Sequence, residues 1–480
     1  MRRIEVFQTH IEVSPYTEGE NFNLEKKFSK WDEITHKYIP ISYYIKDDTL
    51  YLPRGASLNL LTTAFDCTPI ANNIYDRFDY FNEGEPIKPP KSIIQQEAIE
   101  FLLGENKFDY SYKFSQLGLN LSTGDGKTYS AIYSITKQKI KSIIFTHQTK
   151  IKNQWIKAFK EMTSIDNDTL IDINNSNTGL KVLSGEISGN IYFMNYQTAE
   201  SLARNYGWDI ITDLFNKIRV GIKVYDEAHK FFNAMLKIDF FTNTKKTYYL
   251  TATYGRSDKD EQRLYNNAFS HLTRFGEETL NYDVKRRHVI FIACYFNSRP
   301  PYNKVPYLKT PKGFSAYKYI DYELEEEHKT LLRAIYNVLD KVIEFEGKIL
   351  VLSPKIDSTE IIAKAISEEY NEPVGVIHSK VSPENIAIAK EQKIICSTIK
   401  SLGTGVNIEK LRCIINTEPM GSNNVAAQTV GRLREYSPDL DTYFFHLVDH
   451  TVKETIDSQK RIVKGLKKLC KSIITTKLNI

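Results

Sequence analysis

Two patterns of hydrophobic and polar residues divide the chain near residue 90. Before it, apolar and polar residues alternate in 4–7 and 11–13, and again in 41–52 on both sides of Asp47-Asp48. This period of two predicts short strands, with the last pair joined by a turn at the two aspartates. After it, apolar runs at 142–146, 190–194, 222–225 and 247–250 alternate with amphipathic helical segments. That alternation predicts a parallel sheet covered by helices.

The same alternation starts again near residue 325. It predicts a helix over 322–343, a strand over 348–353, a helix over 358–369, and strands over 373–378 and from 394. The stretch 296–313 is rich in Pro, Lys and Tyr and favours a connecting loop over a base-stacking contact. Residues 451–471 predict a basic amphipathic helix, whose charged face either touches nucleic acid or is simply solvated.

These patterns predict an α/β protein with two parallel-sheet lobes and a small β-rich N-terminal domain. We expect the accessory domain at 1–85, the first lobe at 86–280, an inter-lobe strand and loop at 281–324, and the second lobe at 325–480. The first 85 residues contain no catalytic set. A nucleic-acid grip and a structural cap both stay open for them.

Composition fits this globular reading. The 480 residues are 41% hydrophobic and 26% charged, with a formal net charge of +5, which permits a polyanionic partner without requiring one. The five cysteines form no CxxC pair, as expected in a reducing compartment. No run of about 18 apolar residues occurs. We therefore expect a soluble, cytoplasmic protein without a membrane partner.

The stretch 117–130 has the layout of a phosphate-binding loop. Apolar Leu117, Leu119 and Leu121 predict a strand, a glycine turn follows, and Lys127-Thr128 opens a helix. Such a loop turns backbone N–H groups toward phosphates, its Lys reaches the β- and γ-phosphates, and its Thr binds Mg²⁺. Leu121 replaces the first glycine of the usual pattern. The candidate ATP-binding residues are Thr123, Gly124, Asp125, Gly126, Lys127, Thr128 and Tyr129.

Adjacent acids follow the apolar run 222–225. Phosphoryl transfer to water needs one carboxylate to hold Mg²⁺ and another to orient or deprotonate the water. We assign Asp226 to the metal and Glu227 to the base. Because ligands of parallel sheets sit at the carboxyl ends of strands, both acids are expected near the phosphate loop.

Several ordered motifs over about 90–450 resemble superfamily 2 helicases and so imply two RecA-like lobes. Asp226-Glu-Ala-His229 resembles their DEAH-form motif II, and Thr251-Ala-Thr253 resembles motif III. The stretches 92–98, 145–155 and 195–198 resemble the glutamine motif, motif Ia and the strand-end motif after it. The stretches 394–408 and 427–435 resemble motifs V and VI.

The resemblance also assigns roles. Gln95 would bind the adenine edge and Arg432 would act as an arginine finger, with Gln428 beside it. Arg434 comes three residues after Gly431 rather than four, so a salt bridge stays open for it. His229, Thr251 and Thr253 would couple the sites. The further nucleotide contacts are Gly405 and Asn407. The expected nucleic-acid contacts are His147, Gln148, Thr149, Asn195, Thr198, Ser353, Thr398 and Lys400.

Within the superfamily, the chain resembles viral and phage helicases of the UvsW type, poxviral transcript-release helicases and, more distantly, the XPB group. This implies a monomeric, ATP- and Mg²⁺-dependent helicase acting on single-stranded, forked or branched DNA. It would unwind or branch-migrate DNA beside replication or recombination proteins, in the host cytoplasm if the source is viral. The alternatives are a double-strand translocase for protein displacement or transcript release, and a restriction or terminase motor subunit. An RNA helicase is less favoured.

Overall fold

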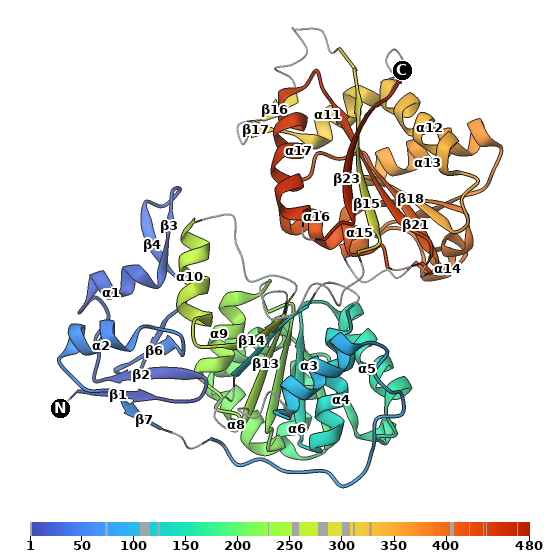
Figure 1. Cartoon of the computed structure of the whole chain (residues 1–480). Helices are drawn as coiled ribbons and strands as arrows, with labels where there is room; N and C mark the ends of the chain where they lie inside the picture. The colour runs from blue at the N-terminus through green and yellow to red at the C-terminus, as the bar shows by residue number, and fades with distance from the viewer. Residues whose placement is uncertain are drawn as a thin grey trace. The chain divides into compact units, whose positions relative to one another are not determined.

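The computed structural model describes residues 2–480 except 73–74, 106–115, 122–124, 229, 252–258, 277–286, 300–307, 311–312, 326–328, 404–407, 422, 435, 438 and 468. The chain divides into two compact units, residues 1–282 and 283–480 (Figure 1). Each unit has its own sheets and its own buried core, and each is described by itself.

The first unit begins with a five-stranded sheet. Its order is β5 (Tyr44–Lys46), β6 (Thr49–Pro53), β2 (His10–Ser14), β1 (Arg3–Val6) and β7 (Ile70–Ala71). Asp47 and Asp48 both have positive φ, as a two-residue turn of type I′ requires, and β5 pairs with β6 on either side of them, so the predicted strand pair is confirmed. A second hairpin, β3 (Ser29–Asp32) with β4 (Lys37–Pro40), was not predicted. The helices here are α1 (Phe22–Lys27) and α2 (Leu58–Phe65).

The rest of the first unit is built on a seven-stranded sheet whose paired strands are all parallel. The order is β10 (Leu170–Ile173), β11 (Ile191–Asn195), β9 (Ser142–Thr146), β12 (Ile222–Asp226), β13 (Lys246–Thr251), β8 (Gln116–Asn120) and β14 (Thr273–Gly276). The four predicted strands are β9, β11, β12 and β13, each within one residue of its expected ends. The predicted parallel sheet is therefore confirmed.

Helices cover both faces of this sheet. One core lies under α3 (Ile93–Leu103), α4 (Lys127–Gln138) and α5 (Thr149–Met162). The opposite core lies under α6 (Ser176–Ser184), α7 (Tyr196–Tyr206), α8 (Asp209–Ile218), α9 (Phe232–Phe240) and α10 (Lys259–Phe269). Neighbouring residues of one strand enter opposite cores, as Val224 and Tyr225 do.

The second unit repeats the architecture with another seven-stranded parallel sheet. The order is β19 (Val374–Ile377), β20 (Ile394–Thr398), β18 (Lys348–Ser353), β21 (Leu411–Asn416), β22 (Thr442–Asp449), β15 (Val289–Phe296) and β23 (Ser472–Lys477). The helices are α11 (Ala316–Leu324), α12 (Thr330–Val342), α13 (Ile356–Tyr370), α14 (Pro383–Glu391), α15 (Ile399–Gly403), α16 (Asn423–Val430) and α17 (Lys453–Leu466). A short hairpin pairs β16 (Lys309–Thr310) with β17 (Gly313–Phe314).

Two expectations for the second unit are wrong. The single helix over 322–343 is two helices, because α11 ends at Leu324 and α12 begins only at Thr330. Glu325, with ψ of 140°, and Lys329, in the left-handed region with φ of +41°, both leave the helical conformation. The basic helix also ends at Leu466 rather than at residue 471, and the β-branched run after it forms β23 beside β15. In the described parts of the chain, no helix combines the length and apolarity needed to cross a membrane.

Candidate nucleotide site and nucleic-acid surface

The predicted phosphate loop lies between the end of β8 and the start of α4. Gly126 stands directly before α4 with φ of +92°, a conformation that L side chains rarely adopt. Lys127 is the first helical residue, and its buried Nζ donates a 2.7 Å hydrogen bond to the carbonyl of Leu121. Asp125 and Thr128 are partly exposed. The turn thus presents a helix N-terminus beside a lysine, which suits phosphate.

Gln95 of α3 packs directly against this turn. A Cβ atom at Gly126 would clash with the Gln95 side-chain amide, so only glycine allows the approach. The backbone N–H of Lys91 donates to Gln95 Oε1 at 2.8 Å and fixes the amide. Tyr129 of α4 donates its hydroxyl to the carbonyl of Lys88 at 2.6 Å and ties the same segment to the loop. The predicted adenine-binding and phosphate-binding residues therefore lie together.

The acid pair follows β12, at the same edge of the sheet. Asp226 is buried, and its Oδ2 accepts a 2.9 Å hydrogen bond from the indole Nε1 of Trp155 on α5. Burial and then the neighbouring Glu227 carboxylate raise the pKa of Asp226, whereas Trp155 and the charge of Lys127 lower it. Glu227 follows β12 directly and has φ of +50°, a left-handed backbone conformation that is uncommon for a non-glycine residue. In the sheet order β13 alone separates β12 from β8, so Asp226 and the Lys127 loop lie one strand apart.

Polar residues also meet at the ends of β9 and β11. Thr146 donates to Asn195 Oδ1 at 2.8 Å, and Asn195 Nδ2 donates to Thr149 Oγ1 at 3.0 Å. Thr149 is exposed at the start of α5, whereas Asn195 and Thr198 are largely buried. Gln148 is half-buried. The structure thus gathers this predicted set at one sheet edge.

His147 directly follows β9 at the same sheet edge, but its side chain has different surroundings. Its side chain is 5% exposed, and its Nε2 lies 3.3 Å from the ammonium of Lys230. Burial, with Lys230 adding to it, lowers the pKa of His147 to about 4, while Glu227 acts in the opposite direction. The imidazole is therefore neutral near pH 7 and interacts with the charges around motif II.

Family models match both units. The model described as "Type III restriction enzyme, res subunit" matches residues 91–256, and "Helicase conserved C-terminal domain" matches residues 331–435. Together the matches span more than half of the chain, and the first contains Gln95, Lys127 and Asp226. The chain belongs to superfamily 2 of the helicases. The predicted family resemblance and fold are confirmed.

Individual relatives agree with this assignment. The chain is 21% identical over 422 residues to "Putative helicase 161L" of Invertebrate iridescent virus 6, covering 84% of this chain and 85% of that protein. Among solved structures, Saccharomyces cerevisiae Dbp5 bound to RNA and ADP BeF3 matches with a TM-score of 0.52 and 14% identity, over 80% of this chain and 90% of that one.

Two further structures match over most of the chain. The restriction-modification enzyme LlaBIII bound to DNA has a TM-score of 0.56 and 13% identity, over 86% of this chain and 33% of that one. T4 UvsW matches over 99% of this chain and 100% of that one at 15% identity, with a TM-score of only 0.36. Dbp5 and LlaBIII thus support the fold without fixing the nucleic acid.

The second unit of the helicase places its predicted residues at strand ends as well. Ser353 and Thr398 are paired neighbours at the ends of β18 and β20. Ser353 is 1% exposed, and its hydroxyl lies 2.7 Å from Thr359 Oγ1 at the start of α13, so the side chain serves that helix. Thr398 Oγ1 donates to Ser401 Oγ at 2.8 Å. Lys400 is exposed, with Nζ 3.3 Å from the hydroxyl of Tyr317.

The motif VI residues surround the end of α16. Gln428 and Arg432 are half-buried, and Arg434 is exposed. The backbone N–H of Arg432 donates to the carbonyl of Thr429 at 3.1 Å and continues the helix by one turn. Their roles toward a nucleotide stay predictions.

Thr128 and Asp226 fit a magnesium ion by the chemistry of their donors. Mg²⁺ prefers hydroxyl, carboxylate, phosphate and water oxygens and takes few protein ligands in nucleotide sites. Among the described residues, no group of three His, Cys, Asp or Glu side chains could hold a metal by itself. Superfamily 2 helicases use ATP with a divalent cation, and this donor set suits an ion bound together with phosphates.

Some predicted residues lie outside the described part of the chain: Thr123, Gly124, His229, Thr253, Gly405 and Asn407. Thr251 is described; it is fully buried at the end of β13 and pairs with Asn120 of β8. Sequence reasoning assigned no role to Trp155 or Lys230. Trp155 closes the motif Ia stretch, and an indole N–H at that fixed place was the signal that could have found it.

Proposed function

We propose that this helicase-type motor acts on DNA, hydrolysing ATP to unwind or branch-migrate forked and recombination-intermediate DNA. The observation that carries the proposal is that the Lys127 loop after β8 and Asp226 at the end of β12 lie at the same edge of one parallel sheet, one strand apart, with Gln95 against the same loop. The chain also has both helicase family matches. The match to a restriction-enzyme subunit family supports DNA as the substrate, because restriction enzymes act on DNA.

The described residues divide the chemistry between them. Lys127 and the N-terminus of α4 would neutralise the β- and γ-phosphates, and Gln95 would recognise the base. Thr128 and Asp226 would hold Mg²⁺, which when bound neutralises charge on the phosphates. Glu227 would orient water and take its proton. Trp155 would fix the Asp226 carboxylate, and the polar groups at the ends of β9 and β11 would position a sugar-phosphate backbone.

The match to a restriction-enzyme subunit also favours a second candidate function. In that case the motor would move along duplex DNA without separating its strands. Protein displacement and transcript release belong to this class. Both candidates need the same ATPase, so strand separation distinguishes them.

Steady-state ATPase rates test the proposal. The protein is assayed with no nucleic acid and then with single-stranded DNA, blunt duplex, forked DNA, four-way DNA and RNA, with Lys127→Ala and Glu227→Gln as inactive controls. The strongest stimulation is expected on forked and four-way DNA, with strand displacement on forks. Stimulation by blunt duplex without displacement would instead establish the translocase. RNA dependence would overturn the DNA assignment, and a lack of stimulation by any of these would overturn the motor.

A further inference from the structure

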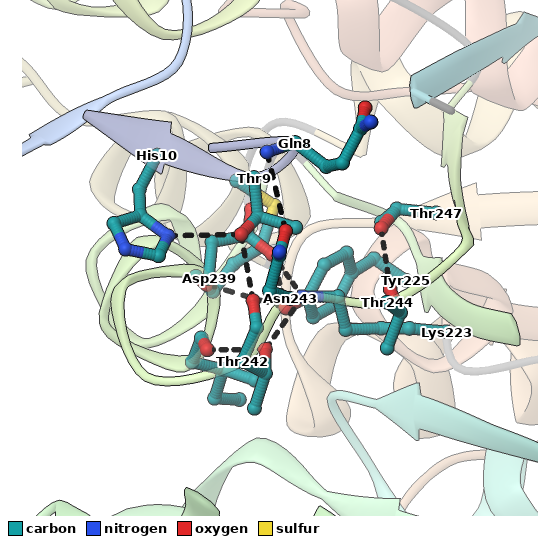
Figure 2. Close-up of polar contacts among 12 residues, drawn as sticks. Gln8, Thr9, His10, Lys223, Tyr225, Asp239, Thr242, Asn243, Thr244 and Thr247 are labelled. Atoms are coloured by element: carbon teal, nitrogen blue, oxygen red, sulfur yellow. Dashed lines mark hydrogen bonds and ion pairs between the residues drawn. The ribbon is translucent and has the colours of Figure 1, made fainter. Parts of the chain in front are cut away.

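One buried carboxylate joins α9 to the two strands that carry motifs II and III. Asp239 of α9 is 1% exposed, and its Oδ1 lies 2.6 Å from Lys223 Nζ and accepts a 2.8 Å hydrogen bond from Tyr225. Its Oδ2 accepts a 2.7 Å hydrogen bond from Tyr249. Lys223 and Tyr225 belong to β12, which ends at Asp226, and Tyr249 belongs to β13, which ends at Thr251 (Figure 2 shows the β12 partners).

The Lys223–Asp239 ion pair is fully buried. Lys223 Nζ also donates to Thr242 Oγ1 at 2.7 Å, just beyond the end of α9. Burial lowers the pKa of Lys223, and the Asp239 carboxylate counteracts that effect. A buried ion pair contributes little net stability, but removing one partner leaves the other charge buried and unpaired. Such a pair therefore specifies how two elements pack together. Here it fixes the position of α9 against β12.

The N-terminal domain binds at this same point. Thr9 donates its hydroxyl to the carbonyl of Thr242 at 2.6 Å, and the backbone N–H of Gln8 donates to Asn243 Oδ1 at 3.2 Å (Figure 2). The ring of Tyr51 stacks on Phe241 at 5.4 Å. A single residue, Thr242, thus contacts both the buried ion pair and the N-terminal domain.

The domain also holds α10, the first described helix after motif III. Arg263 of α10 donates to the carbonyl of Ser29 at 2.8 Å, and Ser270 donates to the carbonyl of Gly55 at 2.7 Å. A Cβ at Gly55 would clash with the backbone of Asn267, so the two backbones touch directly. The N-terminal domain therefore contacts the helices that follow motif II and motif III.

We infer that Asp239 is a positioning residue of the motor: it fixes β12 and β13 beneath motifs II and III. Through Thr242, docking of the N-terminal domain then becomes part of the coupling between nucleic-acid binding and ATP hydrolysis. This inference rests on the proposed function. It assigns the N-terminal domain a role in the ATPase cycle, in addition to the two roles left open by its sequence.

Two neighbouring tyrosines of β13 provide a matched test. Tyr249→Phe removes one buried hydroxyl and with it the 2.7 Å contacts with Asp239 Oδ2 and with Gln116 Oε1 of β8. Tyr248→Phe removes one buried hydroxyl on the opposite face, where it bonds to Gln138 at 2.7 Å and to Ser134 at 3.1 Å. Melting temperatures of both variants close to that of the wild type would show that the fold is kept. The factor by which DNA stimulates the ATPase should fall about tenfold in Tyr249→Phe and stay near wild type in Tyr248→Phe.

Equal effects of the two substitutions, or full stimulation in Tyr249→Phe, would overturn the inference. The N-terminal domain is tested with Thr9→Val, which removes the hydrogen bond to Thr242 and should also lower the stimulation. The double variant Thr9→Val/Tyr249→Phe should lose less than the product of the single losses, because both act through one network. Fully multiplicative losses would refute the link between the domain and Asp239.

Hydrogen exchange separates this inference from the proposed function. If wild type shows no nucleic-acid stimulation, the proposed function fails, and amide exchange in 224–226 then decides the inference. Tyr249→Phe and Thr9→Val should each speed that exchange, and Tyr248→Phe should not. Unchanged exchange in Tyr249→Phe would overturn the positioning role whatever the substrate.

Discussion

Trp155 donates its indole N–H to Asp226 across 2.9 Å, although 71 residues separate the two in sequence. The bond fixes one oxygen of a buried carboxylate and so sets the direction of the other. Groups that orient a metal ligand in this way typically affect metal affinity strongly. The contact therefore makes α5, the helix that contains the end of motif Ia, part of the candidate magnesium site.

Trp155→Phe should raise the Mg²⁺ concentration for half-maximal ATPase about tenfold, because the aromatic ring still fills the core while the hydrogen bond is lost. Titration of ATPase rate with Mg²⁺ at saturating ATP measures this. Trp31→Phe, on the half-exposed hairpin β3–β4, is the control and should leave the titration unchanged. Identical Mg²⁺ titration curves for Trp155→Phe and wild type would contradict the assignment of Asp226 as a Mg²⁺ ligand.

Gln95→Ala should raise the KM for ATP about tenfold and narrow the preference for ATP over GTP, because a site built to hydrogen-bond a base discriminates through those bonds. Steady-state rates with each nucleotide measure both effects. Gln96→Ala removes the next, exposed amide of α3 and serves as the control. A GTP-to-ATP ratio that does not change in Gln95→Ala would contradict the assignment to adenine.

Lys400→Ala should weaken binding of single-stranded DNA and reduce the slope of log affinity against log salt by about 1, since one phosphate contact is lost. Fluorescence anisotropy at several salt concentrations measures the slope. Lys364→Ala, on the exposed face of α13, removes an equal charge that pairs only weakly with Glu368 at 3.8 Å. If both variants change the slope equally, Lys400 acts through net charge and not through contact.

Glu323→Gln should stabilise the chain at high pH. Both carboxyl oxygens of Glu323 are buried. Burial, followed by the Asp449 charge, raises the pKa of Glu323 from 4.5 to about 8, whereas a hydrogen bond with Ser298 acts in the opposite direction. Between these values the folded chain keeps a proton that the unfolded chain releases. Stability is therefore full below pH 4.5 and falls as pH rises toward 8.

Thermal unfolding at several pH values tests this sign. At pH 8 the Glu323→Gln variant should melt about 5 °C above wild type, and near pH 4.5 the two should coincide. Glu368→Gln, an exposed carboxylate of α13, is the matched control. A constant difference between Glu323→Gln and wild type at every pH would show that packing, and not ionisation, accounts for it.

Local sequence determined much of the fold and the candidate site. The apolar runs of β9, β11, β12 and β13 are continuous and short, which identifies buried strands without any partner being known. The phosphate loop and Asp226-Glu227 are also local, because a glycine turn and a strand end are specified by neighbouring residues. The two aspartates between β5 and β6 likewise encode their own turn.

Tertiary structure alone decided which distant residues meet. In the sequence Asp239 looks like an ordinary acidic residue of a helix. Only the packing of α9 on β12 and β13 brings it into contact with Lys223, Tyr225 and Tyr249. Trp155 meets Asp226 for the same reason. The β-branched run of β23 favours a strand locally, but only the tertiary structure gives it β15 as a partner. Hydrogen bonds between distant segments depend on the fold as a whole, whereas periodicity and turns depend on neighbours along the chain.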